Sequence, residues 1–440
     1  MFPFNPLDKE SLMSDPEKIL LSIDGKELVE LALAMGNIYS PTGQEQEMAI
    51  FVFDWMERHG FEPRRIGQTK ERANVLGRYR GTGGGLALAF NSHMDVTLGK
   101  NEIWRLKVPD QKIYYEAWVE GNAIFGNGVV NDKGPMAAWM IAVKALREAG
   151  IRLKGDVLMS AVIGEIGYEP VDEFTGMTYV GKDLGTRYLL THGGTADLAI
   201  VAEATGFKAG WVEAGKAFFK VTIHAGPSRY TPFVQHVSPQ ESKNAIVRAA
   251  HFIPYLERWA KAYEERHTTQ FTGGTVVPKA SVGAIRAGLP YQIIRPPEVC
   301  SLYVDVRLVP GTNPLDIKEE LISLLSKSGL EGDVELYLHR PGYEGVGVEG
   351  LMSQLGKAHE AVFQSKMGSP PDPPTTSMWR DTNVYAEFGI PSINYGPGGG
   401  AGSGQNSLLI EDLVVAAKVY ALTAYYVGQL SRESKDGSRI

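Results

Sequence analysis

The feature that most constrains this chain is the alternation of helical and strand-like patterns along its first half. Apolar residues recur at helical spacing in residues 26–35, 44–59 and 132–150. Apolar runs typical of buried strands alternate with them, at 74–79, 86–95, 156–165 and 198–203. Strands that alternate with helices are typical of a parallel sheet. The sequence therefore predicts an α/β domain with a mostly parallel sheet flanked by helices.

The pattern changes near Lys208. Residues 217–225 and 302–309 alternate between apolar and polar as half-exposed antiparallel strands do, and residues 242–264 between them have helical spacing. We interpret this part as an inserted α+β lid or dimerisation domain that closes near residues 335–340.

Beyond the insertion, a strand at 392–395 and a helix at 411–429 return the chain to its first domain. A proline-rich stretch at 368–376 is expected to form a rigid loop. The domain prediction is a catalytic domain in two parts, residues 1–207 and 342–440, with the lid at residues 208–341.

Charge and composition limit the partners of this chain. A formal net charge of −7 provides no basic surface for nucleic acid or an anionic membrane, and no apolar run is long enough to span a bilayer. Cys300 is the only cysteine, so no internal disulfide is possible, and residues 1–9 lack the pattern of a signal peptide. We expect a soluble cytoplasmic protein that acts on a small molecule.

Polar side chains lie where the predicted strands end. His93 and Asp95 follow the strand at 86–90, Glu165 follows the next, and Glu203 follows the third. Because open α/β sheets build their sites at the carboxyl ends of the strands, these side chains are candidates for one site. Asp132, at a loop-to-helix junction, is a further candidate, either as a metal ligand or as a helix N-cap.

One histidine and two carboxylates would suit a divalent ion that activates water. Asp95 shares a face of the extended segment with His93, so it could hold the far nitrogen of that imidazole. A remaining carboxylate would be the general base. Each residue also has a structural interpretation: Glu165 and Glu203 as charges at the rim of the sheet, and His93 as a histidine satisfied by its neighbours.

The order of these segments resembles the zinc aminoacylase, carboxypeptidase G, acetylornithine deacetylase and succinyl-diaminopimelate desuccinylase family over nearly the whole chain. The similar segments are Asn91–Val96, Gly126–Gly134, Val201–Thr205, Asn244–Ile246, Val304–Arg307 and Gly389–Gly398. The resemblance implies that His93, Asp132 and Glu203 bind one metal ion and that Asp95 supports His93.

The residues that bind the second metal ion in that family are only partly present in this sequence. After residues 396–398 the family has a ligand histidine, but residues 399–406 contain none. The family's paired glutamates, a catalytic base followed by a metal ligand, are reduced to Glu165. Either Glu165 is the base and Ile166 replaces the ligand, or Gly164 replaces the base and Glu165 is the ligand. We favour the base, because an enzyme without the second-metal histidine has no reason to keep that metal's glutamate. The expected cofactor is one divalent ion per chain, Mn, Zn or Co.

The lid contributes three further candidates by resemblance. His236 resembles the family's lid histidine that reaches the substrate, although a surface histidine is an equal alternative. Arg307 and Gln292 lie where the family has residues that grip a carboxylate or the oxyanion, and for Arg307 a structural ion pair is the alternative. The resemblance also implies a homodimer or a higher homo-oligomer.

The leading hypothesis is a hydrolase that cleaves the amide bond of an N-acyl amino acid or a small peptide-like carboxylate, with metal-activated water and Glu165 as general base. One alternative is an aminohydrolase that releases ammonia from an amino-aromatic acid such as a nitroanthranilate. Another is a non-catalytic, ligand-binding protein whose metal site has decayed.

Overall fold

The computed structural model describes residues 13–97, 99, 112–398 and 407–432. By its contacts the chain forms two compact units. The described residues of the first unit fall within Met1–Trp211, Gly345–Pro371 and Val384–Ile440, and the second comprises Val212–Glu344 and Asp372–Asn383. Each unit is described separately below.

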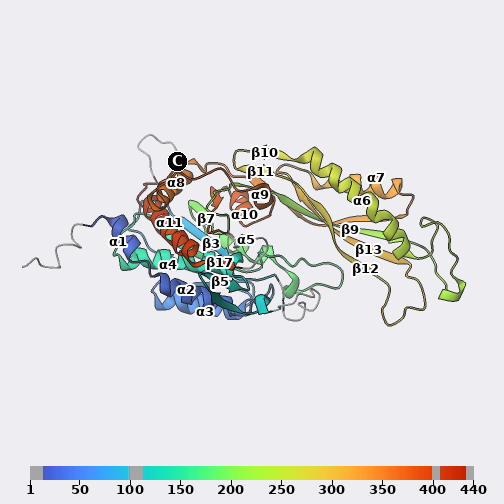
Figure 1. The fold of residues 1–440 in the computed structure, drawn as a ribbon, viewed down its shortest axis with the longest axis horizontal. Coiled ribbons are helices and arrows are strands. Elements are labelled where there is room, and N and C mark those ends of the chain that lie inside the picture. Colours follow the sequence, from blue (N-terminus) through green and yellow to red (C-terminus); the bar gives the residue numbers. More distant parts are fainter. Residues whose placement is uncertain (1–12, 98, 100–111, 399–406, 433–440) are drawn as a thin grey trace, which may run out of the picture. The chain divides into compact units, whose positions relative to one another are not determined.

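The first unit contains a six-stranded mixed sheet (Figure 1). Its order is β1 (Arg64–Ile66), β2 (Asn74–Tyr79), β6 (Val157–Val162), β3 (Leu88–His93), β7 (Leu198–Val201) and β16 (Ser392–Asn394). The last four run parallel, whereas β1 and β2 are antiparallel to their neighbours. The parallel strands are buried along their whole length, which explains their continuous apolar sequence. The predicted α/β fold with a mostly parallel sheet is confirmed.

Helices cover this sheet. They are α1 (Asp15–Leu21), α2 (Gly25–Gly36), α3 (Gln46–Arg58), α4 (Gly134–Glu148), α5 (Thr186–Thr191), α8 (Glu349–Phe363), α10 (Thr382–Glu387) and α11 (Ile410–Gly428). The alanine- and methionine-rich α4 is buried almost all round because it packs against β3, β6 and α11. Asp24 is the N-cap of helix α2, and its carboxylate accepts hydrogen bonds from the amides of Lys26 and Glu27.

Short elements complete the first unit. A three-stranded sheet has the order β17 (Ser407–Leu409), β5 (Ala123–Gly126) and β4 (Ala117–Glu120). Single turns of helix lie at η4 (Lys112–Tyr114), η5 (Val129–Lys133), η6 (Met177–Tyr179) and η7 (Lys182–Leu184). Two of these turns, η5 and η7, carry residues of the candidate site.

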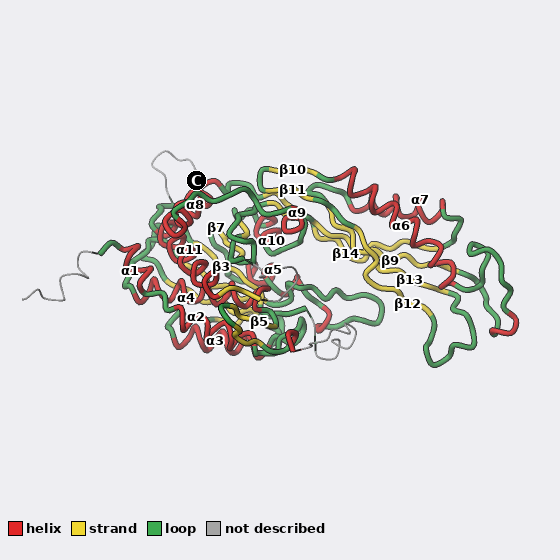
Figure 2. Tube along the Cα trace, viewed as in Figure 1, coloured by secondary structure: helices red, strands yellow, loops and turns green. Residues whose placement is uncertain are grey.

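The second unit is built on a four-stranded antiparallel sheet (Figure 2). Its order is β12 (Ala280–Ala287), β13 (Val299–Leu308), β9 (Gly215–His224) and β14 (Gly332–Arg340). Burial alternates along β9, as the sequence predicts, and the inward side chains pack with those of α6 (Ala245–His267) and α7 (Pro314–Lys327). The smaller elements are β8 (Val212–Glu213), β10 (Thr269–Phe271), β11 (Gly274–Val276), β15 (Tyr343–Glu344) and η8 (Thr231–Phe233).

The proline-rich stretch differs from its prediction. Where a rigid loop is expected, the structure has the short helix α9 (Pro373–Thr376), since proline is well suited to the first turn of a helix. The segment Asp372–Asn383, which the sequence analysis assigns to the first domain, belongs to the second unit. The hydrogen bonds that fasten it there include one from Thr376 Oγ1 to the Thr275 carbonyl (2.5 Å) and one from the Val277 amide to Ser377 Oγ (2.8 Å).

Within the described ranges, every helix is too short or too polar to cross a lipid bilayer.

Candidate metal centre

Three buried side chains from separate segments of the first unit converge. His93 is the last residue of β3, Glu203 follows β7, and Asp132 lies in η5 just before α4. β3 pairs in parallel with β7, so both strands end at the same edge of the sheet. One ligand atom from each residue lies within 4.8 Å of the others. Among the residues that the structure describes, no other group of three such side chains comes this close together.

The Asp132 carboxylate is buried without a partner. Neither oxygen has a hydrogen-bond partner within the described part of the chain, and Asp132 does not cap α4, whose N-cap is Lys133. Burial, and then the charge of Glu203, raise the pKa of Asp132 well above its usual value, although His93 and the nearby Ser92 hydroxyl oppose this rise. A buried carboxylate in this state is unfavourable unless a cation compensates it. The three side chains therefore fit a divalent cation, which supplies that compensation.

His93 is held by both ring nitrogens. Its Nδ1 lies 2.9 Å from the carbonyl oxygen of Asp95 and 3.5 Å from that residue's Oδ1, while Nε2 lies 2.9 Å from Asn131 Oδ1. Burial disfavours the imidazolium, but the hydrogen bond and charge of Asp95 outweigh burial and raise the pKa of His93 well above its usual value. Nδ1 faces Asp95, so Nε2, whose partner here is the Asn131 amide oxygen, is the nitrogen that would bind a cation beside Asp132.

Asp95 joins the histidine to the glutamate loop. Its carboxylate accepts hydrogen bonds from Thr42 Oγ1 (2.6 Å) and from the backbone amides of Glu165 and Ile166 (3.1 Å each). Burial raises the pKa of Asp95, but His93, Thr42 and Lys182 together lower it below the usual value. An ionised Asp95 thus fixes His93 and the backbone of Glu165 at once.

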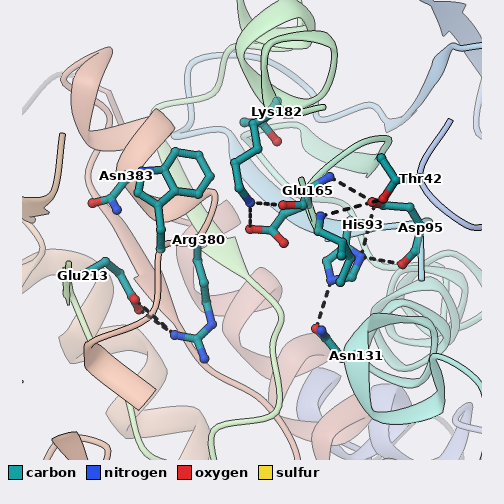
Figure 3. A network of polar contacts seen from close by, with 12 residues as sticks. Thr42, His93, Asp95, Asn131, Glu165, Lys182, Glu213, Arg380 and Asn383 are labelled. Atoms are coloured by element: carbon teal, nitrogen blue, oxygen red, sulfur yellow. Dashed lines mark hydrogen bonds and ion pairs between the residues drawn. The ribbon is translucent and has the colours of Figure 1, made fainter. Parts of the chain in front are cut away.

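Glu165 makes a contact that the sequence analysis did not anticipate. Its Oε1 lies 2.5 Å from the ammonium of Lys182, which also donates a hydrogen bond to the Glu165 carbonyl (Figure 3). Both side chains are buried. Glu165 is not among the three residues whose ligand atoms converge, yet its charge acts on both His93 and Asp132. The carboxylate therefore lies beside the ligand group, held by a lysine.

The glycine-rich motif near the end of the chain supports the Glu203 loop. A Cβ added at Gly396 would lie 2.2 Å from the Glu203 carbonyl oxygen, so only glycine allows this approach. The Gly396 amide donates to Thr205 Oγ1 (3.0 Å), and its carbonyl accepts from the Phe207 amide (2.8 Å). Residues 399–406, where the family's ligand histidine is absent from the sequence, lie outside the described residues.

The three lid candidates all lie in the second unit. Arg307 is on β13, and its Nη2 forms an ion pair with Asp305 at 2.9 Å, with 26% of its side chain exposed. His236 is exposed on the loop between η8 and α6, and Gln292 is exposed in the turn after β12. Their roles in substrate binding stay predictions.

A second polar network belongs wholly to the second unit (Figure 3). Arg380 Nη1 lies 3.1 and 3.2 Å from the two carboxylate oxygens of buried Glu213. Asn383 donates to the Ala214 carbonyl (3.0 Å) and accepts from the Tyr343 amide (2.9 Å). These contacts hold segment 372–383 to the unit, and no feature of the local sequence indicated them.

Sequence reasoning missed three residues of the candidate centre. Asn131 could have been found, since it directly precedes Asp132. No local sequence pattern indicates Thr42 or Lys182, because the tertiary fold brings each of them to its partner. Thr42 is 53 residues from Asp95 in sequence, and Lys182 is 17 residues from Glu165.

The chain is similar to known proteins in sequence and in fold. The family model for peptidase family M20/M25/M40 matches residues 89–426. The N-formyl-4-amino-5-aminomethyl-2-methylpyrimidine deformylase of Bacillus subtilis (strain 168) is 24% identical over 431 residues, which cover 90% of this chain and 93% of that protein.

Two solved structures show the same fold. The M20 family metallo-carboxypeptidase Sso-CP2 from Sulfolobus solfataricus has a TM-score of 0.66 at 15% identity, over 91% of this chain and 99% of that one. The YXEP protein of Bacillus subtilis, a dinuclear metal-binding peptidase of the M20 family, has a TM-score of 0.58 at 15% identity, over 92% and 98% of the two chains.

Proposed function

Because this chain belongs to the peptidase family M20/M25/M40, we propose that it cleaves the amide bond of an N-acyl amino acid or a small peptide-like carboxylate. As a member of that family it is a metal-dependent hydrolase that acts on carbon–nitrogen bonds. The observation that supports the proposal most is the convergence of buried His93, Asp132 and Glu203 beside Glu165.

One divalent cation per chain is the cofactor in this proposal, with His93, Asp132 and Glu203 as its ligands. One imidazole and two carboxylates suit Mn, Zn or Co. A divalent cation held there, when bound, lowers the pKa of a water molecule and polarises a substrate carbonyl. The oxygens of Asp132, which have no hydrogen-bond partner in the described part of the chain, support this assignment, since a buried carboxylate needs a positive charge close by.

Glu165 is the general base. Lys182 occupies Oε1, so Oε2 accepts the proton of the attacking water and passes it to the nitrogen of the leaving amine. A C–O bond forms at the carbonyl carbon as the C–N bond breaks, which gives a carboxylic acid and an amine. Asp95 positions both partners, because it contacts the His93 ring and the Glu165 amide.

In this proposal Arg307 binds a carboxylate of the substrate, and His236 and Gln292 make further contacts with the substrate. A guanidinium suits a planar carboxylate because it can donate two parallel hydrogen bonds. Arg307 uses Nη2 for Asp305, which leaves its other nitrogens for a ligand.

A panel of substrates tests this proposal. The metal-loaded protein is incubated with N-acetyl and N-formyl amino acids, dipeptides, an N-formyl aminomethylpyrimidine and an amino-aromatic acid, and the released amine, acid and ammonia are measured. We expect a free amine and an acid from at least one amide. The pyrimidine is included because of the deformylase relative. Ammonia as the sole nitrogen product would favour an aminohydrolase, and no turnover at all would favour a binding protein.

Glu165→Gln is the matching variant. It keeps the size of the side chain but cannot accept a proton, so turnover should fall by roughly 10²-fold or more while the bound metal stays at the wild-type level. Loss of the metal in this variant would show instead that Glu165 is a ligand.

A further inference from the structure

The ammonium of Lys182 is buried beside Glu165, and it neither gives nor accepts a proton in the proposed hydrolysis. Lys182 lies in η7, and its Nζ contacts both Oε1 (2.5 Å) and the backbone carbonyl of Glu165. Two contacts to one residue fix the carboxylate and its main chain together. Burying a lysine ammonium costs free energy unless the ammonium is paired and hydrogen-bonded. The buried position of Lys182 therefore depends on its contacts with Glu165.

Two glycines bring the lysine to this position. A Cβ at Gly164, where φ is +70°, would lie 2.6 Å from the Gly181 carbonyl oxygen, and a Cβ at Gly181 would lie 3.0 Å from the Gly164 carbonyl oxygen. The residue after each glycine is one member of the ion pair. The close backbone approach of Gly164 and Gly181 therefore places Glu165 and Lys182 side by side.

The segment that carries Lys182 is fastened on both sides. Before it, the Arg72 guanidinium donates to the carbonyls of Met177 and Val180. After it, Asn74 Nδ2 donates to the Leu184 carbonyl (2.7 Å), and Asn74 Oδ1 accepts from the Ile163 amide (3.0 Å). Asn74 thus joins the Lys182 segment directly to the strand that leads into Glu165.

The charges of the region call for a fixed positive group. Asp95, Asp132, Glu165 and Glu203 are all buried. One divalent cation balances two carboxylates, so further positive charge is needed. Among the described residues of the first unit, Lys133 is the other buried lysine, but its Nζ donates to the Ile38 carbonyl (2.7 Å). Lys182, in contrast, donates to one of the four buried carboxylates, that of Glu165.

We propose that Lys182 is a positioning residue that substitutes for a second cation: it neutralises and orients Glu165 and keeps the centre at one metal ion. This inference rests on the proposed function, in which Glu165 is the base. A metal ion bound to Oε1 would lie about 2 Å from that oxygen, where it would meet the Lys182 ammonium at 2.5 Å from the same atom. Removing that ammonium, and supplying a ligand in its place, should open a second site.

Kinetics test the positioning role. Lys182→Met removes the charge but keeps much of the side chain, and we expect kcat to fall by roughly 10²-fold with KM changed by less than about threefold, because the base is misplaced. Lys182→Arg keeps the charge and should recover most of kcat. Lys144→Met is the matched control, since it also removes a lysine from an ion pair of the first unit, with Glu27 at 2.5 Å, and should behave as wild type. Wild-type kcat in Lys182→Met, or equal losses in the Met and Arg variants, would overturn the proposal.

Metal content tests the second role without any substrate. Lys182→Glu, titrated with Mn²⁺ or Zn²⁺, should bind about two ions per chain where the wild type binds one, whereas Lys144→Glu should bind one. One ion or none in Lys182→Glu would overturn the proposal. If a variant does not fold, as judged by its thermal transition, Lys182→Gln replaces Lys182→Met and Lys182→Asp replaces Lys182→Glu, with the same outcomes. If the wild type binds one ion but cleaves no amide, the proposed function is refuted. The metal content of the wild type and of Lys182→Glu would still decide whether Lys182 prevents the binding of a second ion.

Discussion

At the scale of single residues, the candidate centre holds together groups that would repel one another without a cation. Asp132 is buried, neither of its carboxylate oxygens has a hydrogen-bond partner among the described residues, and Glu203 lies close enough to raise its pKa. His93 faces the same group, with Asp95 behind its Nδ1. These contacts prepare a site for positive charge, and they make the charge state of the metal-free centre sensitive to pH.

Metal binding should therefore release protons. A cation requires a neutral imidazole and an ionised carboxylate, but the pKa values of His93 and Asp132 are both raised in the metal-free protein. Protons thus compete with the cation, and the affinity should rise as the pH rises through these raised pKa values. Calorimetric titration with Mn²⁺ in two buffers of different ionisation enthalpy measures the released protons. An affinity that is independent of pH, or that falls as the pH rises, would show that these two residues are not ligands.

The residues that sequence could predict are those at the ends of recognisable elements. His93, Asp95, Glu165 and Glu203 follow strands, and the structure finds all of them buried there. The contact between Lys182 and Glu165 could not be predicted from sequence, because it depends on the close approach of Gly164 and Gly181. A contact between two loops that are distant in sequence produces no periodic pattern in the sequence of either loop.

At the scale of elements, a buried ion pair ties the helix α3 region to the Lys182 segment. Arg72 pairs with Glu45 at 2.7 Å, with both side chains buried, and also donates to the carbonyls of Met177 and Val180. One guanidinium therefore fixes the start of α3 and the segment before η7. We infer that the position of Glu165 depends on this arginine through Lys182.

Arg72→Ala should destabilise the fold and weaken activity together. Breaking a buried pair leaves Glu45 without its partner, which costs about 3–5 kcal/mol in the free energy of unfolding. The released segment should also lower kcat. Chemical denaturation measures the first effect and steady-state kinetics the second. Arg80→Ala, which breaks the exposed pair of Arg80 with Glu62, is the control and should leave both close to wild type. A stable, fully active Arg72→Ala would refute the coupling.

At the scale of the whole molecule, the pattern of the sequence predicts the architecture well. Alternating patterns predict the α/β sheet, and the change of period near Lys208 corresponds to the antiparallel sheet of the second unit, whose strand β9 begins at Gly215. The exception is segment 372–383, which joins the second unit although it follows α8 of the first. Its partners, such as Glu213 for Arg380, are distant in sequence, so no local pattern predicts that this segment belongs to the second unit.

The proposed centre uses side chains from three distant segments of the chain to hold one metal ion. Its most direct test is the metal content per chain, measured by mass spectrometry after loading with Mn²⁺, Zn²⁺ or Co²⁺ and removal of excess metal, for the wild type and for Asp132→Asn. We predict one ion per chain in the wild type and a large loss in the variant. A stable value of two in the wild type, or an unchanged value in Asp132→Asn, would contradict this account.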